Sequence, residues 1–215
     1  MKKFLKIACI LLIGFSIGSN AQCYENISFW GHTVTQKEDG TLWGWGSSSW
    51  GNLSTNNGNE GEPNPIQIGI LNEWNKIYLG GSRTFAIKNN GTLWGWGYGG
   101  LGQAGDTFPA AYFRDTPIQI GTETNWVYVG TGYNTSYAIK SDGTLWAWGS
   151  NNYGQVGDGT LVDRRQPVQI GTDTDWIRVT GGLRHGIAQK ANGAIYTWGT
   201  NDFGQLGNGT MDAVS

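Results

Sequence analysis

The sequence predicts an all-β protein, a β-propeller made of four-stranded blades. The first observation is a repeat: DGTLWGWG at 39–46 returns as NGTLWGWG at 90–97, DGTLWAWG at 142–149 and NGAIYTWG at 192–199. The turn glycines of these copies are 51, 52 and 50 residues apart, and a fixed period near 50 is typical of propellers and solenoids. The second is that each unit holds four short strand-like segments, and the third is that helical periodicity is missing beyond residue 21.

The elements of one unit follow in order. In the second unit we expect strands near 74–79, 85–88, 93–97 and 118–120. NNGT and SDGT separate the second strand from the third, and Asn-Gly or Asp-Gly supplies the positive φ of a tight hairpin turn. PIQIG or PVQIG marks the fourth strand at 65–69, 117–121 and 167–171. The units therefore lie near 27–69, 74–121, 126–171 and 176–215, the last of them incomplete.

The tryptophans follow the repeat. Side chains alternate faces along a strand, so Trp43 and Trp45 share one face while Gly44 leaves the other face thin. We expect the rings of one blade to pack against the thin face of its neighbour, because strand glycines mark close approach. This packing is favoured over an exposed sugar-binding stripe. Ten of the 12 tryptophans occupy such repeat positions, namely Trp43, Trp45, Trp94, Trp96, Trp146, Trp148 and Trp198 on third strands and Trp74, Trp126 and Trp176 on first strands.

The N-terminus reads as a secretory signal peptide. Residues 1–21 combine a basic start, an apolar run too short to span a bilayer and a small-residue site after Ala21. We expect cleavage there and a secreted, periplasmic or cell-surface protein; a retained interfacial anchor is the alternative. Cleavage leaves 11 basic against 16 acidic residues, a net charge of −5, without the basic stripe of a nucleic-acid binder. Cys23 then stands alone, which excludes an internal disulfide and leaves lipidation as an alternative fate.

Several motifs together resemble the regulator of chromosome condensation repeat. They are DGTLWGWG, NYGQVGDGT, FGQLGNGT, PVQIG and GLRHG at 182–186, and they cover most of residues 27–210 in the right order. The resemblance, here to a secreted bacterial type, implies a β-propeller, seven-bladed in the best-known members. About four copies are present and the last stops before its fourth strand. We therefore expect the N-terminal part of a longer propeller, with a four-bladed ring one strand short as the alternative.

The sequence indicates no enzyme, cofactor or metal site. The two histidines, His32 and His185, lie on different blades at the same repeat position and are expected to form hydrogen bonds between strands. Asp173 and Asp175 are spaced like calcium ligands, but the corresponding segments GTETNW and GILNEW of other units keep only one carboxylate each. Turn chemistry is therefore the preferred interpretation. No nucleophile, base and acid can be placed together.

The segments after the third strand vary most between units. Loops on a rigid scaffold commonly carry binding, and these contain the aromatic and arginine residues that protein interfaces favour: Trp50, Tyr112, Phe113, Arg114, Arg164 and Arg165. Trp50 matches Leu101, Tyr153 and Phe203 in register, so packing is its alternative. We expect a non-catalytic scaffold that binds a protein or peptide. The alternatives by analogy are a nucleotide-exchange regulator of a small GTPase and an inhibitor of a secreted enzyme such as a β-lactamase.

Overall fold

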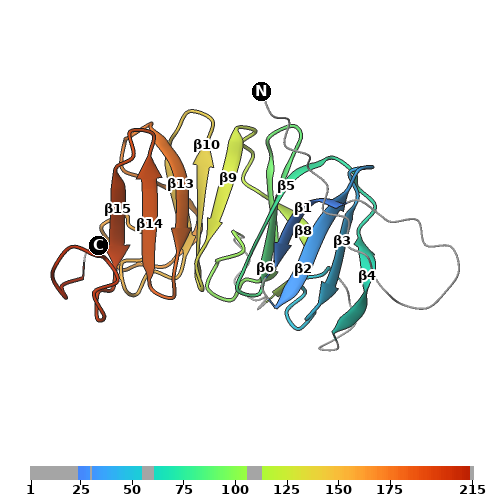
Figure 1. The fold of residues 1–215 in the computed structure, drawn as a ribbon, viewed down its shortest axis with the longest axis horizontal. Coiled ribbons are helices and arrows are strands. Elements are labelled where there is room, and N and C mark those ends of the chain that lie inside the picture. Colours follow the sequence, from blue (N-terminus) through green and yellow to red (C-terminus); the bar gives the residue numbers. More distant parts are fainter. Residues whose placement is uncertain (1–23, 30, 55–60, 106–112, 214–215) are drawn as a thin grey trace, which may run out of the picture.

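The chain folds into a row of antiparallel sheets that form an open β-propeller (Figure 1). The computed structural model describes residues 24–29, 31–54, 61–105 and 113–213, so the predicted signal peptide, Cys23, Trp30 and Tyr112 lie outside the described residues. Within the described ranges every regular element is a strand, and the strands form four sheets, here called blades 1 to 4. The all-β, partial-propeller prediction is confirmed.

Each blade is a meander in which every strand pairs with the next along the chain. Blade 1 contains β1 (Tyr24–Phe29), β2 (His32–Lys37), β3 (Leu42–Gly46) and β4 (Glu62–Ile68). Blade 2 contains β5 (Trp74–Gly80), β6 (Arg83–Lys88), β7 (Leu93–Tyr98) and β8 (Phe113–Ile120). Blade 3 contains β9 (Trp126–Thr131), β10 (Thr135–Lys140), β11 (Leu145–Gly149) and β12 (Arg164–Ile170). Among the described residues blade 4 has three strands, β13 (Trp176–Gly181), β14 (His185–Lys190) and β15 (Ile195–Gly199).

The predicted hairpin turns form at the glycines of the repeat. Gly91 has φ +78° and Gly143 has φ +79°, the left-handed region that glycine enters without steric cost. A Cβ on Gly91 would lie 1.9 Å from the carbonyl oxygen of Thr124, where the chain enters the next blade. The turn therefore needs glycine both for its dihedral angle and for the close contact between blades.

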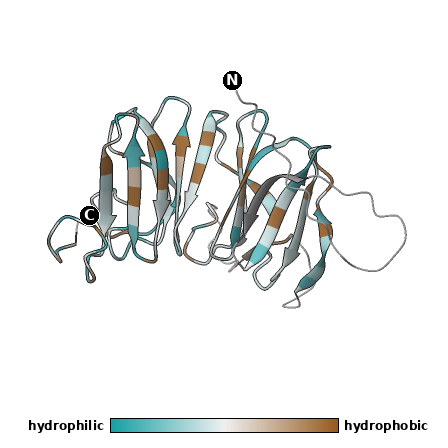
Figure 2. Ribbon diagram, in the orientation of Figure 1, coloured by the Kyte–Doolittle hydropathy of each residue, from teal (hydrophilic) through white to brown (hydrophobic). Residues whose placement is uncertain are grey.

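Three hydrophobic clusters hold the blades together, one at each interface. The first strand of each blade contacts the first and second strands of the blade before it. Hydrophobic positions recur along the strands of all the blades (Figure 2). Each blade thus has a back face, which carries the motif tryptophans and looks toward the preceding blade, and a forward face, which looks toward the following one.

The two tryptophans of each motif differ in burial, although they share the back face. The first ring is half-buried at Trp43, Trp94 and Trp146. In blade 2 this ring belongs to Trp94. Its indole N–H donates to the hydroxyl of Thr92 in the adjacent turn at 2.9 Å, and the ammonium of Lys88 lies 4.1 Å from its ring centre. This ring stabilises its own hairpin.

The second motif tryptophan joins two blades. Trp96 and Trp148 are 0% exposed and Trp198 is 7% exposed, whereas Trp45 on blade 1 is half-buried. The indole N–H groups of the buried three donate to backbone carbonyls of the preceding blade, Trp96 to Asn52 at 3.0 Å, Trp148 to Gln103 at 3.0 Å and Trp198 to Gln155 at 2.8 Å. The first-strand rings Trp74, Trp126 and Trp176 are buried at 3%, 2% and 8% exposure.

Candidate functional site

The variable segments after the third strands are only partly loops. Their first halves fold back between the blades, where Asn52, Gln103 and Gln155 are no more than 2% exposed. Leu53 fills the forward face of blade 1, and a Cβ on Gly44 would approach its Cδ2 to 2.8 Å. The face of the motif that carries Gly44 therefore packs against the segment that follows the third strand of the same blade, as well as against the next blade.

The predicted arginines lie at the starts of fourth strands. Arg164 is engaged within its own blade: its Nε donates to Oδ2 of Asp158 at 2.6 Å and its Nη2 lies 3.3 Å from the hydroxyl of Thr160. Burial raises the pKa of Asp158, but hydrogen bonds from Thr160 and Arg164 outweigh this effect and hold the pKa below its usual value. Arg164 thus orders its loop, while Arg165 is exposed and Arg114 is half-buried.

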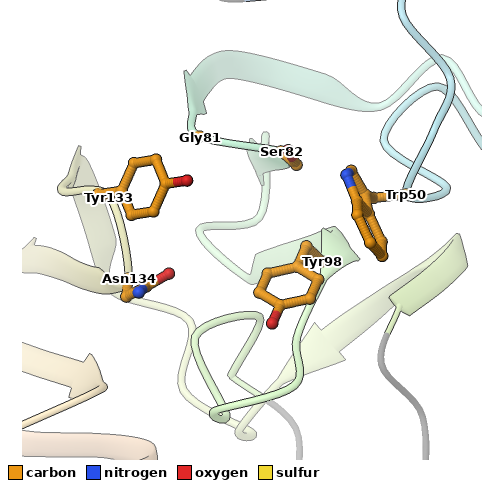
Figure 3. Close-up of a pocket in the computed structure, with 6 residues that line it drawn as sticks. All are labelled: Trp50, Gly81, Ser82, Tyr98, Tyr133 and Asn134. Atoms are coloured by element: carbon orange, nitrogen blue, oxygen red, sulfur yellow. The ribbon is translucent and has the colours of Figure 1, made fainter.

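The aromatic residues at this end of blades 1 to 3 surround a surface hollow of about 350 Å³. It is lined by Trp50 from blade 1, Gly81, Ser82 and Tyr98 from blade 2, and Tyr133 and Asn134 from blade 3. Figure 3 shows Trp50 and Tyr98 beside each other and Tyr133 with Asn134 across the hollow. We call these residues the aromatic hollow.

The geometry leaves the rings available for contact. Trp50 is 44% exposed and meets Tyr98 edge to face, with ring centres 5.2 Å apart and planes at 68°. Tyr133 is 53% exposed. Phe113 is 49% exposed and is the register partner of Tyr98 across β7 and β8, so the two residues are neighbours in the sheet.

A buried arginine positions the far wall of the hollow. Arg83 is 0% exposed, and its guanidinium donates to the carbonyl oxygens of Tyr133 at 2.8 Å and Gly132 at 2.7 Å. Burial lowers the pKa of Arg83 to about 10, so the group remains protonated at neutral pH. These bonds fix the β9–β10 turn, and with it Tyr133, against blade 2.

The remaining candidates are placed in structural contacts. His32 is 2% exposed and bonds the Thr84 hydroxyl of blade 2 at 3.1 Å, so it links blades rather than strands of one sheet. Asp173 and Asp175 lie 2.7 Å and 3.1 Å from the ammonium of Lys190. Within the described part of the chain, histidine, cysteine and carboxylate side chains form no group of three that could hold a metal ion. In the same residues, no helix is long and apolar enough to cross a membrane.

Sequence reasoning found Trp50 and Phe113 but missed Tyr98 and Tyr133. The signal that marks Tyr98 is a departure from the repeat, because Ser47, Ser150 and Thr200 stand at its position in the other blades. At the position of Tyr133 the other units carry Trp30, Gly81 and Leu183, so the repeat keeps no residue type there. Of the predicted residues Trp50 lines the hollow, whereas Arg164 is paired with Asp158 and Tyr112 lies outside the described residues.

The fold and its repeated contacts define an open β-propeller, and comparison with family models identifies its repeats. Two models described as the regulator of chromosome condensation (RCC1) repeat match this chain, one at residues 142–189 and 192–215 and the other at 126–155. Residues 126–189 and 192–215 are thus identified as RCC1 repeats.

Relatives with curated descriptions match a minor part of their own length. The chain is 30% identical over 126 residues to the mitochondrial RCC1 domain-containing protein RUG3 of Arabidopsis thaliana, covering 58% of this chain and 28% of that protein. It is 29% identical over 134 residues to the Ultraviolet-B receptor UVR8 of the same plant, covering 62% and 30%.

Solved structures show the same fold over nearly the whole chain. Yeast RCC1 (Prp20), in its structure bound to Kap60, matches with a TM-score of 0.80 at 19% identity, over 92% of this chain and 48% of that one. Human WBSCR16 matches with a TM-score of 0.76 at 20% identity, over 93% and 53%. The chain therefore spans about half the length of these propellers.

Proposed function

We propose that this protein is a secreted or cell-surface, non-catalytic scaffold that binds a protein partner at the aromatic hollow. The observation that carries the proposal is the hollow itself, where exposed Trp50 and Tyr133 face each other from different blades. Large aromatic residues in a concave, rigid setting are the groups that most often dominate protein interfaces. A volume of about 350 Å³ lies at the small end of the range for ligand pockets and suits one or two side chains of a partner.

The relatives support a protein as the partner. Prp20 has been crystallised bound to Kap60, and another structure of Prp20p was described together with its binding to Gsp1p and histones. The negative charge expected after signal cleavage favours a partner other than nucleic acid or an anionic membrane. The identity of the partner is open to experiment.

Secretion is tested by expressing the full chain and sequencing the N-terminus of the exported product. We expect it to begin at Gln22. A product that retains Met1 and stays inside the cell would overturn the extracellular part of the proposal and leave the binding site to be tested separately.

Binding is tested with the double variant Trp50→Ala/Tyr133→Ala. The processed protein serves as bait for surface and secreted proteins of its own source, and the captured partner is then titrated against each variant. Two central aromatic contacts should weaken the affinity by at least about thirtyfold, corresponding to about 2 kcal/mol.

Phe203→Ala is the matched control, since Phe203 occupies the register of Trp50 on blade 4 and is 90% exposed. It should leave both affinity and melting temperature unchanged. If the double variant binds as well as the parent, the partner binds elsewhere and the hollow is not the site.

A further inference from the structure

The aromatic hollow has a counterpart between blades 3 and 4. Tyr153 stands there at the position of Trp50 and is 42% exposed, close to the 44% of Trp50. The guanidinium of Arg184, from the turn before β14, lies over the ring of Tyr153 with its Cζ 4.1 Å from the ring centre. A cation within about 6 Å of a ring centre is attracted by the negative face of the ring. An exposed aromatic ring at this position of the repeat therefore accepts a guanidinium.

In blade 2 the position of Arg184 is taken by Ser82. The same backbone bond identifies the two positions: the carbonyl of Ser82 accepts the N–H of Tyr98 at 2.9 Å, and the carbonyl of Arg184 accepts the N–H of Thr200 at 3.0 Å. Ser82 lines the hollow together with Trp50. Where blade 4 sends a guanidinium over the aromatic ring, blade 2 offers a hydroxymethyl group, and the remaining space belongs to the hollow.

The interface between blades 2 and 3 supplies a third case. Leu101 stands at the position of Trp50, and Asn134 stands at the position of Arg184. There the aromatic ring and the cation are replaced together. Of the three interfaces in the described part of the chain, the one between blades 1 and 2 is thus the case that keeps an aromatic ring and has an uncharged residue at the facing position.

The lining of the hollow suits a guanidinium. Tryptophan is the ring that attracts a cation most strongly, and Trp50, Tyr98 and Tyr133 place three rings around one space (Figure 3). The hydroxyl of Ser82 and the side-chain carbonyl of Asn134 are hydrogen-bond acceptors in the same lining. Arginine combines a flat cation that stacks on aromatic faces with five N–H donors, so it matches both kinds of group.

The charges around the site are compatible with a cationic side chain. The residues that line the hollow carry no charged side chain. Arg83 lies behind the wall, and the carbonyl oxygens of Gly132, Tyr133 and Thr135 accept its hydrogen bonds and so oppose its charge. The chain as a whole has 16 acidic against 14 basic residues, or 16 against 11 after the predicted cleavage, which favours the approach of a positively charged partner.

We propose that the aromatic hollow binds an arginine side chain of the partner. The guanidinium lies over the indole ring of Trp50, as Arg184 lies over Tyr153, and donates to the oxygen atoms of Ser82 and Asn134. This inference rests on the proposed function for the place of binding and adds the chemistry that is recognised there. The partner is accordingly a protein or peptide with an exposed arginine.

The test compares two probes, N-acetyl-arginine amide and N-acetyl-citrulline amide. Citrulline has nearly the shape of arginine but carries no charge, so the pair isolates the contribution of the cation. Binding is followed by NMR titration of the indole N–H signal of Trp50, which the variant Trp50→Phe assigns by its loss. We expect saturable shifts of this signal and an affinity for the arginine probe at least about threefold higher than for the citrulline probe.

Ser82→Arg reproduces the arrangement of blade 4 within blade 2. The new guanidinium should cover Trp50 and abolish binding of the arginine probe, while circular dichroism and the melting temperature report that the fold is retained. Ser82→Ala is the matched control, because it removes the hydroxyl without filling the hollow. It should keep the preference for arginine over citrulline.

The outcomes separate this inference from the proposed function. Equal affinities for the two probes, no saturable binding of either, or arginine binding that survives Ser82→Arg in a folded protein would each overturn the assignment of an arginine. None of these results bears on the proposed function, which the captured partner and Trp50→Ala/Tyr133→Ala decide. If that double variant keeps its affinity for the partner while the probes are discriminated, the hollow recognises arginine but the partner binds elsewhere.

Discussion

Replacing Trp148 by alanine should lower the free energy of unfolding by about 3–5 kcal/mol, the range for removing a large aromatic residue from a core. Trp148 connects blade 3 to blade 2: it is 0% exposed, meets Phe85 edge to face at 5.8 Å and donates its indole N–H to the Gln103 carbonyl. Loss of this ring leaves a cavity between two rigid sheets, which cannot collapse without shifting a whole blade.

The magnitude follows from the buried surface. A fully buried indole removes about 150–250 Å² from water, worth about 4–6 kcal/mol as an upper bound. The lost hydrogen bond adds little, because the hydroxyl of Ser136 still donates to the Gln103 carbonyl at 2.8 Å. Trp148→Phe keeps most of the ring and loses the donor, so its cost should be about 1–2 kcal/mol.

The assay is equilibrium unfolding in urea, followed by circular dichroism, with Trp146→Ala as the comparison. Trp146 lies two residues earlier on the same strand and face but is half-buried. Its removal loses a contact with Lys140, whose ammonium lies 3.7 Å from the ring centre, and part of a ring pair with Trp126. We expect about 1–2 kcal/mol for this variant. Equal losses for Trp146→Ala and Trp148→Ala, or less than about 1 kcal/mol for Trp148→Ala, would refute the assignment of the second ring to the interface.

Three further predictions concern other contacts of the blades. Gly95→Ala should lower the free energy of unfolding by about 1–3 kcal/mol in the same assay, because the new Cβ would lie 2.9 Å from the carbonyl oxygen of Ala104 and 2.9 Å from the ring of Phe85. His32→Gln should reduce the acid sensitivity of the fold. Burial lowers the pKa of His32 to about 4, so below pH 6.5 the unfolded chain takes up a proton that the folded chain refuses, and stability falls by about 2 kcal/mol between pH 6.5 and 5. Urea titrations across that window should show the fall in the parent and not in the variant. Arg164→Ala should cost about 1–3 kcal/mol through its charged hydrogen bond with Asp158, whereas exposed Arg165→Ala should change stability by less than about 0.5 kcal/mol.

Controls make these outcomes specific. Ala147 occupies the position of Gly95 in blade 3, and Ala147→Gly should cost only about 0.5–1 kcal/mol. His185→Gln, at the position of His32 on blade 4, should leave the loss between pH 6.5 and 5 in place. If Gly95→Ala proves neutral, the returning segment can move aside. If the His32 variant keeps the full acid sensitivity, another group is responsible for it. Equal effects of Arg164→Ala and Arg165→Ala on stability would show that the bond between Arg164 and Asp158 does not stabilise the loop.

The repeat made most of the fold predictable from the sequence. Period, turn glycines and alternation gave the strands and their order, and they placed Trp43 and Trp45 on one face. They could not show that only the second ring is buried at the blade interfaces. That difference depends on where the segment after the third strand returns, and the position of Asn52 between two blades is a tertiary contact without a local signal.

The site was harder to predict for a related reason. Arg164 and Trp50 are residue types that protein interfaces favour, but residue type does not reveal that Arg164 pairs with Asp158 while Trp50 remains exposed. Fourth strands also begin earlier than expected: β8 starts at Phe113, not near residue 118. Phe113 and Arg114 are therefore strand residues, and Phe113 is the register partner of Tyr98.

In a repeat protein, position and exposure together separate the two kinds of surface. Residues that conform to the repeat and are buried, such as Trp96 and Leu93, are explained by stacking. Ile195 conforms to the repeat and is 55% exposed, because it lies on the outer face of the last blade that the structure describes. Tyr133 stands at a position where the repeat keeps no residue type and is 53% exposed, so stacking gives no reason for its presence, which supports the proposed partner site. The same reasoning that assigns the tryptophan motif to the core thus favours the aromatic hollow as the place where a partner would bind.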